Sequence, residues 1–263
     1  MKNLHRACGL PIYLDDDYRL VFGEEVPAVS PAVRRLEDMR EVLANQTATG
    51  PGELYFMYRD VCLPAHRPLL EAVSLRFDLT VIRPGKVGDE YVKTAGHYHP
   101  LVPGTGLSYP EVYQVVHGTA HYLLQRLEPG RGEVVDVVLI EACPGDIAVV
   151  PPRYGHVTIN PTSEVLVMAN WVERHFSSVY ELLRARHGAA YYEIEKDGQG
   201  MFIRNPHYRE VAPLRRALPV FYPEWGLVRG VPVYLSCLRD PERFRFLVRP
   251  QDYAADWDGF LKR

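Results

Sequence analysis

The stretch Thr94–His99, which reads TAGHYH, is the part of this chain that decides its fold. His97 and His99 are two residues apart, so on a β-strand both side chains point to the same face. Glu111 follows a loop rich in Gly and Pro, and His156 follows an apolar run. Three imidazole nitrogens and one carboxylate oxygen suit one divalent metal ion. Iron(II) is our first choice, with manganese, nickel or zinc as alternatives, and positions stay open for a substrate.

The spacing around these four residues resembles the two sequence motifs of the cupin fold. His97–Gly118 approximates the first motif, G-x5-H-x-H-x3-4-E-x6-G, and Gly145–Asn160 approximates the second, G-x5-P-x-G-x2-H-x3-N. The match departs at two points, because eleven residues separate His99 from Glu111 and because Arg153 replaces the internal glycine of the second motif. Both motifs occur in the right order, and we therefore predict a cupin-type metal site.

Strand signals dominate between residues 70 and 200. Short segments rich in Val, Ile and Tyr are bounded by Gly, Pro or Asn, a pattern that predicts strands. The expected strands are Leu75–Pro84, Glu90–Thr94, Glu111–His117, Ala120–Arg126, Glu133–Glu141, Asp146–Val150, His156–Ile159 and Val165–Trp171. Together they suggest a double-sheet barrel or jelly roll, with turns at Val116–Thr119 and Pro129–Gly132 and a helix over Ser178–His187 outside it.

We expect a mainly β fold, a cupin double-stranded β-helix, with extensions at both ends. Residues 1–70 should form an N-terminal helical arm, in which Ser30 caps a helix whose apolar residues lie within Val33–Leu43. Residues 71–205 should form the barrel with the metal site. Residues 206–263 are rich in Pro and aromatic side chains, which need a surface to bury against, so this extension should pack on the barrel.

Composition excludes several other classes of function. The chain has 263 residues, 47% of them hydrophobic and 24% charged, which is an ordinary globular balance. The net charge is -3 and Lys and Arg form no dense cluster, so we expect no nucleic-acid partner. The chain also lacks an apolar run of about 18 residues, so we expect no membrane span. The four scattered cysteines form no C-x-x-C pair, which favours reduced thiols in a cytoplasmic protein.

Five segments together resemble a more specific family, the cupin-type or archaeal-type glucose-6-phosphate isomerases. They are Val33–Met39, Pro84–Gly88, Thr94–His99, Glu111–Tyr113 and Pro151–Asn160. The resemblance covers roughly residues 30–205 and includes the long loop before the glutamate, which generic cupins lack. It implies a homodimeric metalloenzyme whose hexose phosphate substrates are glucose 6-phosphate and fructose 6-phosphate.

The resemblance also implies roles for single residues. The metal ligands would be His97, His99, Glu111 and His156. The contacts to the substrate phosphate would be Tyr55, Thr80, Thr94 and the backbone N–H of Gly96. The catalytic residues would be Glu111, Tyr113 and Tyr180.

Two positions depart from the family's pattern. Val172 stands where the family has an active-site tyrosine, and Ser178 stands where it has a histidine two residues before Tyr180. His175 lies three residues upstream of Ser178 and is a candidate replacement. Both departures concern the end of the pocket that holds the sugar, not the metal or phosphate ends.

The chemistry of an aldose–ketose isomerase needs these residue types. Hydrogen moves between C1 and C2, and a divalent metal stabilises the negative charge that develops on their oxygens. Glu111 is the only acidic residue that the motif places inside the barrel, so it is a ligand, a general base, or both in turn. In a metal-assisted hydride shift, Glu111 would only hold the metal.

Other interpretations stay open on the sequence alone. Thr80 and Thr94 also fit ordinary β-branched strand residues, and His117 and His121 fit either exposed strand ends, which we favour, or alternative ligands. An iron dioxygenase would use similar ligands, but its pocket should be apolar or catecholic. A non-catalytic sugar-phosphate-binding cupin would bind hexose phosphates without turnover, and the choice between glucose and mannose phosphates is not fixed.

Overall fold

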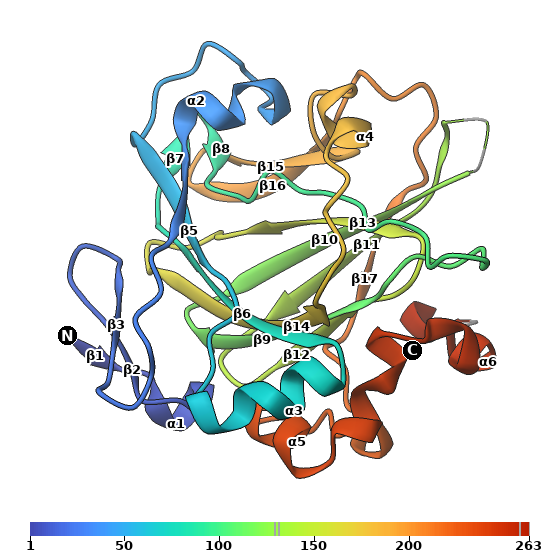
Figure 1. Ribbon diagram of the computed structural model, residues 1–263. Coiled ribbons are helices and arrows are strands. Elements are labelled where there is room, and N and C mark those ends of the chain that lie inside the picture. Colours follow the sequence, from blue (N-terminus) through green and yellow to red (C-terminus); the bar gives the residue numbers. More distant parts are fainter. Residues whose placement is uncertain (129, 131, 258, 263) are drawn as a thin grey trace.

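The fold is built from two mainly antiparallel β-sheets that lie face to face, with β17 alone pairing in parallel among the described strands of these sheets (Figure 1). The computed structural model describes residues 1–128, 130, 132–257 and 259–262, so the turn expected at Pro129–Gly132 lies partly outside the described residues. The larger sheet has the order β12-β9-β14-β6-β5-β4. Its strands are β4 (Ala32–Arg35), β5 (Glu53–Tyr58), β6 (Leu75–Ile82), β9 (Glu111–His117), β12 (Ile147–Val150) and β14 (Leu166–Glu173).

The second layer of the barrel is a four-stranded sheet with the order β13-β10-β11-β17. Its strands are β10 (Ala120–Leu127), β11 (Val134–Ala142), β13 (Tyr154–Ile159) and β17 (Leu214–Ala217). Apolar side chains from both sheets, such as Leu124 and Ile140 on one and Val112 and Phe77 on the other, belong to one buried cluster. This mainly β double sheet confirms the expected jelly-roll fold.

Smaller elements surround the barrel. Two further sheets comprise β1 (Lys2–Asn3), β2 (Ile12–Leu14) and β3 (Leu20–Phe22), and β7 (Lys86–Val87), β8 (Glu90–Tyr91), β15 (Tyr191–Lys196) and β16 (Gln199–Arg204). The α-helices are α1 (His5–Cys8), α2 (Leu36–Met39), α3 (Arg67–Ala72), α4 (Glu181–Arg184), α5 (Val233–Arg239) and α6 (Ala254–Trp257). Short 3-10 turns occupy Arg40–Val42, Pro64–His66, Pro223–Trp225, Pro241–Leu247, Pro250–Tyr253 and Phe260–Lys262. In the described part of the chain, no helix is both long and apolar enough to cross a membrane.

Two expected helices differ from the structure. The segment expected as one helix over Val33–Leu43 begins as strand β4, because Val33 and Arg34 pair with β5 at the edge of the larger sheet. Helix α2 starts only at Leu36, where the Asp38 carboxylate accepts a hydrogen bond from the Arg35 N–H at 2.9 Å. The helix expected over Ser178–His187 is confined to the four residues of α4.

The C-terminal segment covers the outer face of the larger sheet. In Figure 1, α5 lies against the side of this sheet that faces away from the second layer. The Trp171 indole N–H donates to the Val233 carbonyl at 3.0 Å, and the Val233 N–H donates to Gln114 Oε1 at 2.9 Å. Tyr234 stacks on Trp171 with ring centroids 5.9 Å apart. With both faces covered, β9 and β14 are buried almost throughout, which explains their continuous apolar runs.

Candidate metal centre

The four predicted ligands converge inside the barrel at one end of the two sheets. His97 and His156 form an antiparallel bridge, in which each N–H donates to the other residue's carbonyl at 3.0 to 3.1 Å. Gly96 adopts φ +71°, and a Cβ there would lie 2.4 Å from Val157 Cγ2, so only glycine fits the turn before His97. Tyr98 points the opposite way, to Gln125, and the extended backbone therefore turns His97 and His99 to the same side, as the sequence predicted.

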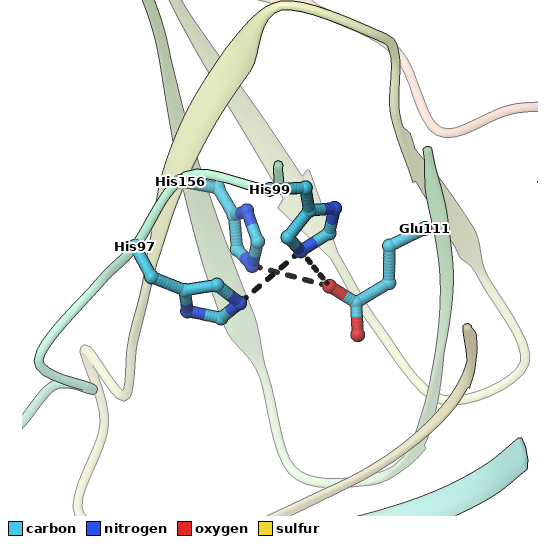
Figure 2. A group of neighbouring side chains, drawn as sticks. All are labelled: His97, His99, Glu111 and His156. Carbon is cyan, nitrogen blue, oxygen red and sulfur yellow. Dashed lines mark hydrogen bonds and ion pairs between the residues drawn. The ribbon is translucent and has the colours of Figure 1, made fainter. Parts of the chain in front are cut away.

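Figure 2 shows the three imidazoles and the carboxylate pointing toward one another. One ligand atom from each of His97, His99, Glu111 and His156 lies within 4.8 Å of the others. His99 Nε2 lies 3.1 Å from His97 Nε2 and 3.2 Å from Glu111 Oε2, while His156 Nε2 lies 3.4 Å from Glu111 Oε2. This is the convergence that a divalent ion requires of nitrogen and oxygen ligands.

The hydrogen bonds around the cluster leave ligand lone pairs free to bind a cation. His99 Nδ1 donates to the Tyr109 carbonyl at 2.7 Å, so a neutral His99 presents the lone pair of Nε2 to the cluster. Glu111 Oε2 is buried and accepts no hydrogen bond from the residues that the structure describes. A buried carboxylate oxygen without a donor, beside a nitrogen lone pair, is costly unless a cation lies between them. The donor set therefore fits a metal ion.

Burial also sets the protonation states that metal binding needs. Desolvation lowers the pKa of His97 well below its usual range and lowers the pKa of His156 to about 4. Burial acts to raise the pKa of Glu111, but contact with His99 and the nearby His156 outweighs it, and that pKa is lowered. At neutral pH the cluster thus offers uncharged imidazoles from His97 and His156 and an ionised carboxylate from Glu111, which are the forms that bind metals.

A cavity adjoins the ligands, and every residue for which the sequence predicted a substrate or catalytic role lines it. These are Tyr55, Thr80, Thr94, Gly96, Glu111, Tyr113 and Tyr180. Glu111 and Tyr113 lie on one face of β9, and the Tyr113 hydroxyl is 3.1 Å from His156 Nε2. Burial and the charge of Glu111 raise the pKa of Tyr113 well above its usual range, so its phenol is neutral.

Two of the hydroxyl groups accept hydrogen bonds from the protein and keep their own protons. Tyr55 Oη accepts from the Ala95 N–H at 3.2 Å, and Thr94 Oγ1 accepts from the Thr158 N–H at 3.0 Å. Burial raises the pKa of Tyr55 to about 12, so its phenol remains a donor at neutral pH. Both O–H groups can therefore donate to an anionic ligand in the cavity.

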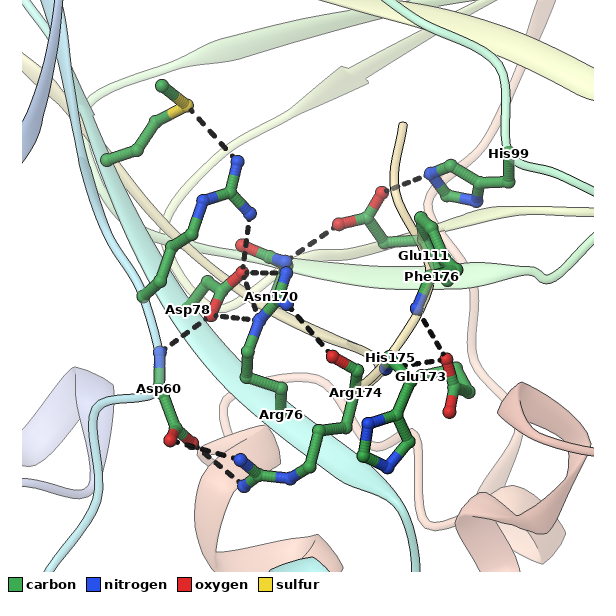
Figure 3. A network of polar contacts seen from close by, with 12 residues as sticks. Asp60, Arg76, Asp78, His99, Glu111, Asn170, Glu173, Arg174, His175 and Phe176 are labelled. Atoms are coloured by element: carbon green, nitrogen blue, oxygen red, sulfur yellow. Dashed lines mark hydrogen bonds and ion pairs between the residues drawn. The ribbon is translucent and has the colours of Figure 1, made fainter. Parts of the chain in front are cut away.

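The structure locates the departures from the family's pattern. Val172 and Ser178 both line the cavity, whereas His175 does not. The His175 N–H donates to Glu173 at 2.8 Å, and Phe176, the next residue, packs on His99 with ring centroids 4.5 Å apart (Figure 3). Away from the cavity, His117 lies 3.0 Å from Lys2 Nζ, and His121 contacts Glu193 at 2.9 Å.

Sequence reasoning missed a polar network beneath the metal ligands, drawn in Figure 3. The Asn170 amide donates to Glu111 Oε1 at 2.7 Å. Asp78 also lines the cavity, so Glu111 is not its only acidic residue, and the Asp78 carboxylate accepts hydrogen bonds from Arg76. Asn170 and Asp78 are cross-strand neighbours on β14 and β6, and the period-2 alternation of those strands was the available signal.

The family model and the curated relatives that match this chain point to the same family. The model of the family described as glucose-6-phosphate isomerase (GPI) matches residues 33–210. Glucose-6-phosphate isomerase of Thermococcus kodakarensis is 29% identical over 76% of this chain and 97% of its own length, and that of Pyrococcus furiosus is 31% identical over 70% and 92%. Among solved structures, a mutant of Bacillus subtilis oxalate decarboxylase is 19% identical over 49% of this chain and 28% of that chain, with a TM-score of 0.35.

Proposed function

The chain belongs to the glucose-6-phosphate isomerase family, and we propose that it interconverts glucose 6-phosphate and fructose 6-phosphate with one divalent metal ion bound per chain. One observation carries this proposal. A single cavity joins a set of three nitrogen ligands and one oxygen ligand to hydroxyl groups that can donate to a phosphate. Iron(II) is the metal that we favour, and manganese, nickel and zinc suit the same donors.

His97, His99, Glu111 and His156 would hold the metal, which would stabilise negative charge on the oxygens at C1 and C2. Tyr55, Thr80, Thr94 and the Gly96 N–H would receive the phosphate, in keeping with their place along the cavity wall. Tyr113 and Tyr180 would contact the sugar between these two ends.

Glu111 would act as a ligand rather than as the base that removes the C2 proton. The Asn170 amide donates to Oε1, and Oε2 faces the imidazoles of His99 and His156, so both oxygens already have partners among the protein's own side chains. This arrangement favours a hydride shift. Turnover in deuterated water then leaves C1 and C2 of the product unlabelled, and metal-saturated Glu111→Gln retains substantial activity. A loss of about a hundred- to ten-thousandfold, together with solvent label in the product, would instead assign the base role to Glu111.

The test of the function is a coupled assay that follows conversion of fructose 6-phosphate to glucose 6-phosphate after reconstitution with iron(II), manganese or nickel. We expect turnover that depends on added metal and about one ion per chain. The double variant His97→Ala, His99→Ala should lose both, while His117→Ala, which alters a histidine outside the cavity, should keep both. Full metal occupancy in the double variant would refute the site.

Two results would point to another function of the same cavity. Binding of hexose phosphates without turnover would identify a non-catalytic binding protein, which the departures at Val172 and Ser178 make a real alternative. Oxygen consumption with small aromatic or thiol substrates would identify a dioxygenase.

We propose further that the protein is a cytoplasmic homodimer. The described residues form no disulfide, and Cys8, Cys62 and Cys237 are buried free thiols. Because the chain's own segments cover the outer face of the larger sheet, a dimer would have to form through other surfaces. Light scattering at the mass of one chain would refute the dimer.

A further inference from the structure

One arginine in the wall of the cavity retains most of its hydrogen-bonding capacity. Arg59 lines the cavity, and 45% of its side chain is exposed. Its contacts to described residues are weak. Nη1 lies 3.3 Å from Asp78 Oδ2, and Nη2 lies 3.7 Å from Met57 Sδ. Charge-assisted hydrogen bonds are usually 2.7–2.9 Å long, so neither contact uses the guanidinium well.

Asp78 does not neutralise Arg59, because other groups already surround its carboxylate. Arg76 donates to it through Nε and Nη2 at 2.9 Å, and the Asp60 N–H donates to Oδ1 at 2.9 Å. The carboxylate is almost fully buried and shares one negative charge between two arginines. Arg59 is the exposed one of the two, and its positive charge is therefore available to a ligand in the cavity.

Arg59 lies beside Asp78 of β6, two residues along that strand from Thr80, one of the predicted phosphate contacts. Arg59 directly follows β5, in which Met57 pairs with Thr80 of β6. One guanidinium nitrogen contacts the sulfur of Met57, which lines the same cavity as Arg59 and Thr80. The next residue, Asp60, has a left-handed backbone with φ +59° and is anchored through its carboxylate to Arg174. The start of the Arg59 side chain is thus fixed in position.

We propose that Arg59 is a specificity-determining residue that binds the phosphate of the substrate. The four phosphate contacts predicted from the sequence are neutral donors, whereas a phosphate dianion is bound best where a fixed positive charge accompanies them. Arg59 supplies that charge and selects phosphorylated sugars over neutral ones. This inference rests on the proposed function, because it takes a sugar phosphate to be the ligand.

The test is calorimetric titration of the metal-loaded protein with inorganic phosphate, glucitol 6-phosphate and glucitol. Neither glucitol compound has a carbonyl group, so neither can be isomerised. Arg59→Met should weaken binding of inorganic phosphate and glucitol 6-phosphate by roughly tenfold or more, because a hydrogen bond to a charged group is lost. Affinity for glucitol should stay unchanged, and Arg59→Lys should restore part of the loss, because it returns the charge without the planar fork.

The matched control is Arg243→Met. Arg243 also has one carboxylate partner, Asp240, and half of its side chain is exposed, but it lies outside the cavity. This variant should bind all three ligands as the parent does. In Arg59→Met the Michaelis constant for fructose 6-phosphate should rise while metal content stays at the parental level.

The outcomes separate this inference from the proposed function. Parental affinity of Arg59→Met for both phosphate compounds, or an equal loss of affinity for glucitol, would overturn the role of Arg59 even in an active isomerase. If the parent fails to isomerise hexose phosphates but binds inorganic phosphate in an Arg59-dependent way, the proposed function falls and the phosphate contact stands. A parent that binds neither phosphate compound overturns the contact.

Discussion

Asn170 determines which oxygen of Glu111 faces the three histidines, because its amide donates to the other oxygen at 2.7 Å. Replacing it in Asn170→Leu keeps a side chain of similar size but leaves Glu111 Oε1 buried without a donor. Replacing a residue that orients a metal ligand typically lowers metal affinity by about 10- to 100-fold. We expect a loss of that size, measured by competition with a chelator for manganese(II).

Gln114→Leu is the matched control for this prediction. Gln114 is a buried carboxamide on the same sheet but on its outer face, where it bonds to Val231 and Val233. Its replacement should lower stability and leave the affinity for manganese(II) unchanged. If both variants lose metal to the same degree, general destabilisation would explain the effect, and Asn170 would have no specific part in orienting Glu111.

At the residue scale, the sequence was most informative where spacing alone defines a site. Histidines two residues apart share a face of an extended strand, so His97 and His99 could be predicted to bind one metal together. Arg59, Asp78 and Asn170 stand in segments that also fit an ordinary strand pattern. Asp78 lies two residues from Thr80 on β6, so period-2 alternation indicated that both share a face, but its pairing with Asn170 depends on a strand register that the sequence does not state.

At the scale of elements, the strands were predictable because short runs of Val, Ile and Tyr end at Gly or Pro. β6, β9 and β14 begin and end close to the expected residues. The segment around Val33 was misread as helix because its apolar spacing also fits a helix. The segment forms a strand because it pairs with β5. Such a tertiary contact cannot be predicted from local propensity.

Helix α5 lies outside residues 33–210, the region that the family model matches, and it packs on the larger sheet. The Tyr234 ring packs against both Phe77, at a centroid distance of 4.9 Å, and Trp171, and it is fully buried. Tyr234→Ala should therefore lower the free energy of unfolding by about 3–5 kcal/mol, the usual cost of removing a large buried aromatic side chain. Urea unfolding followed by tryptophan fluorescence measures the change.

Leu218→Ala, in the same C-terminal segment, is the control for the stability of α5. Leu218 is 78% exposed, so its substitution should change the free energy of unfolding by about 0.5 kcal/mol at most. Equal effects of Leu218→Ala and Tyr234→Ala would show that α5 does not stabilise the larger sheet. Metal content of folded Tyr234→Ala should be unchanged, because Tyr234 is not among the residues that line the cavity.

At the scale of the whole molecule, ion pairs join segments that are far apart in the sequence. The division into residues 1–70, 71–205 and 206–263 remains a prediction, although β4 and β5 of the first segment complete the larger sheet. The Asp60 carboxylate accepts hydrogen bonds from Arg174 at 2.8 and 3.0 Å and pairs with Arg67. It thereby ties the end of β5 to α3 and to the end of β14.

This link predicts how the stability of the molecule depends on pH. Burial acts to raise the pKa of Asp60, but hydrogen bonds and charge from Arg174 and Arg67 outweigh it, so the folded-state pKa is lowered. A carboxyl group with a lowered pKa stabilises the fold above its unfolded pKa of about 3.9, and the contribution disappears as the pH falls through the folded value. Asp60→Asn should therefore cost about 1–3 kcal/mol at pH 7, and the difference from the parent should shrink below about pH 4.

Urea unfolding of parent and variant between pH 3 and pH 7 checks both the size and the direction of this effect. Asp240→Asn removes a carboxylate of similar local geometry, 2.9 Å from Arg243, but about half of each side chain is exposed to solvent. Solvent screening limits such surface pairs to about 0–1 kcal/mol, so this variant should track the parent at every pH. A constant gap between parent and Asp60→Asn down to pH 3 would contradict the lowered pKa. It would mean that Asp60 acts through the shape and packing of its side chain, and not through the charge that joins the ends of β5 and β14 to α3.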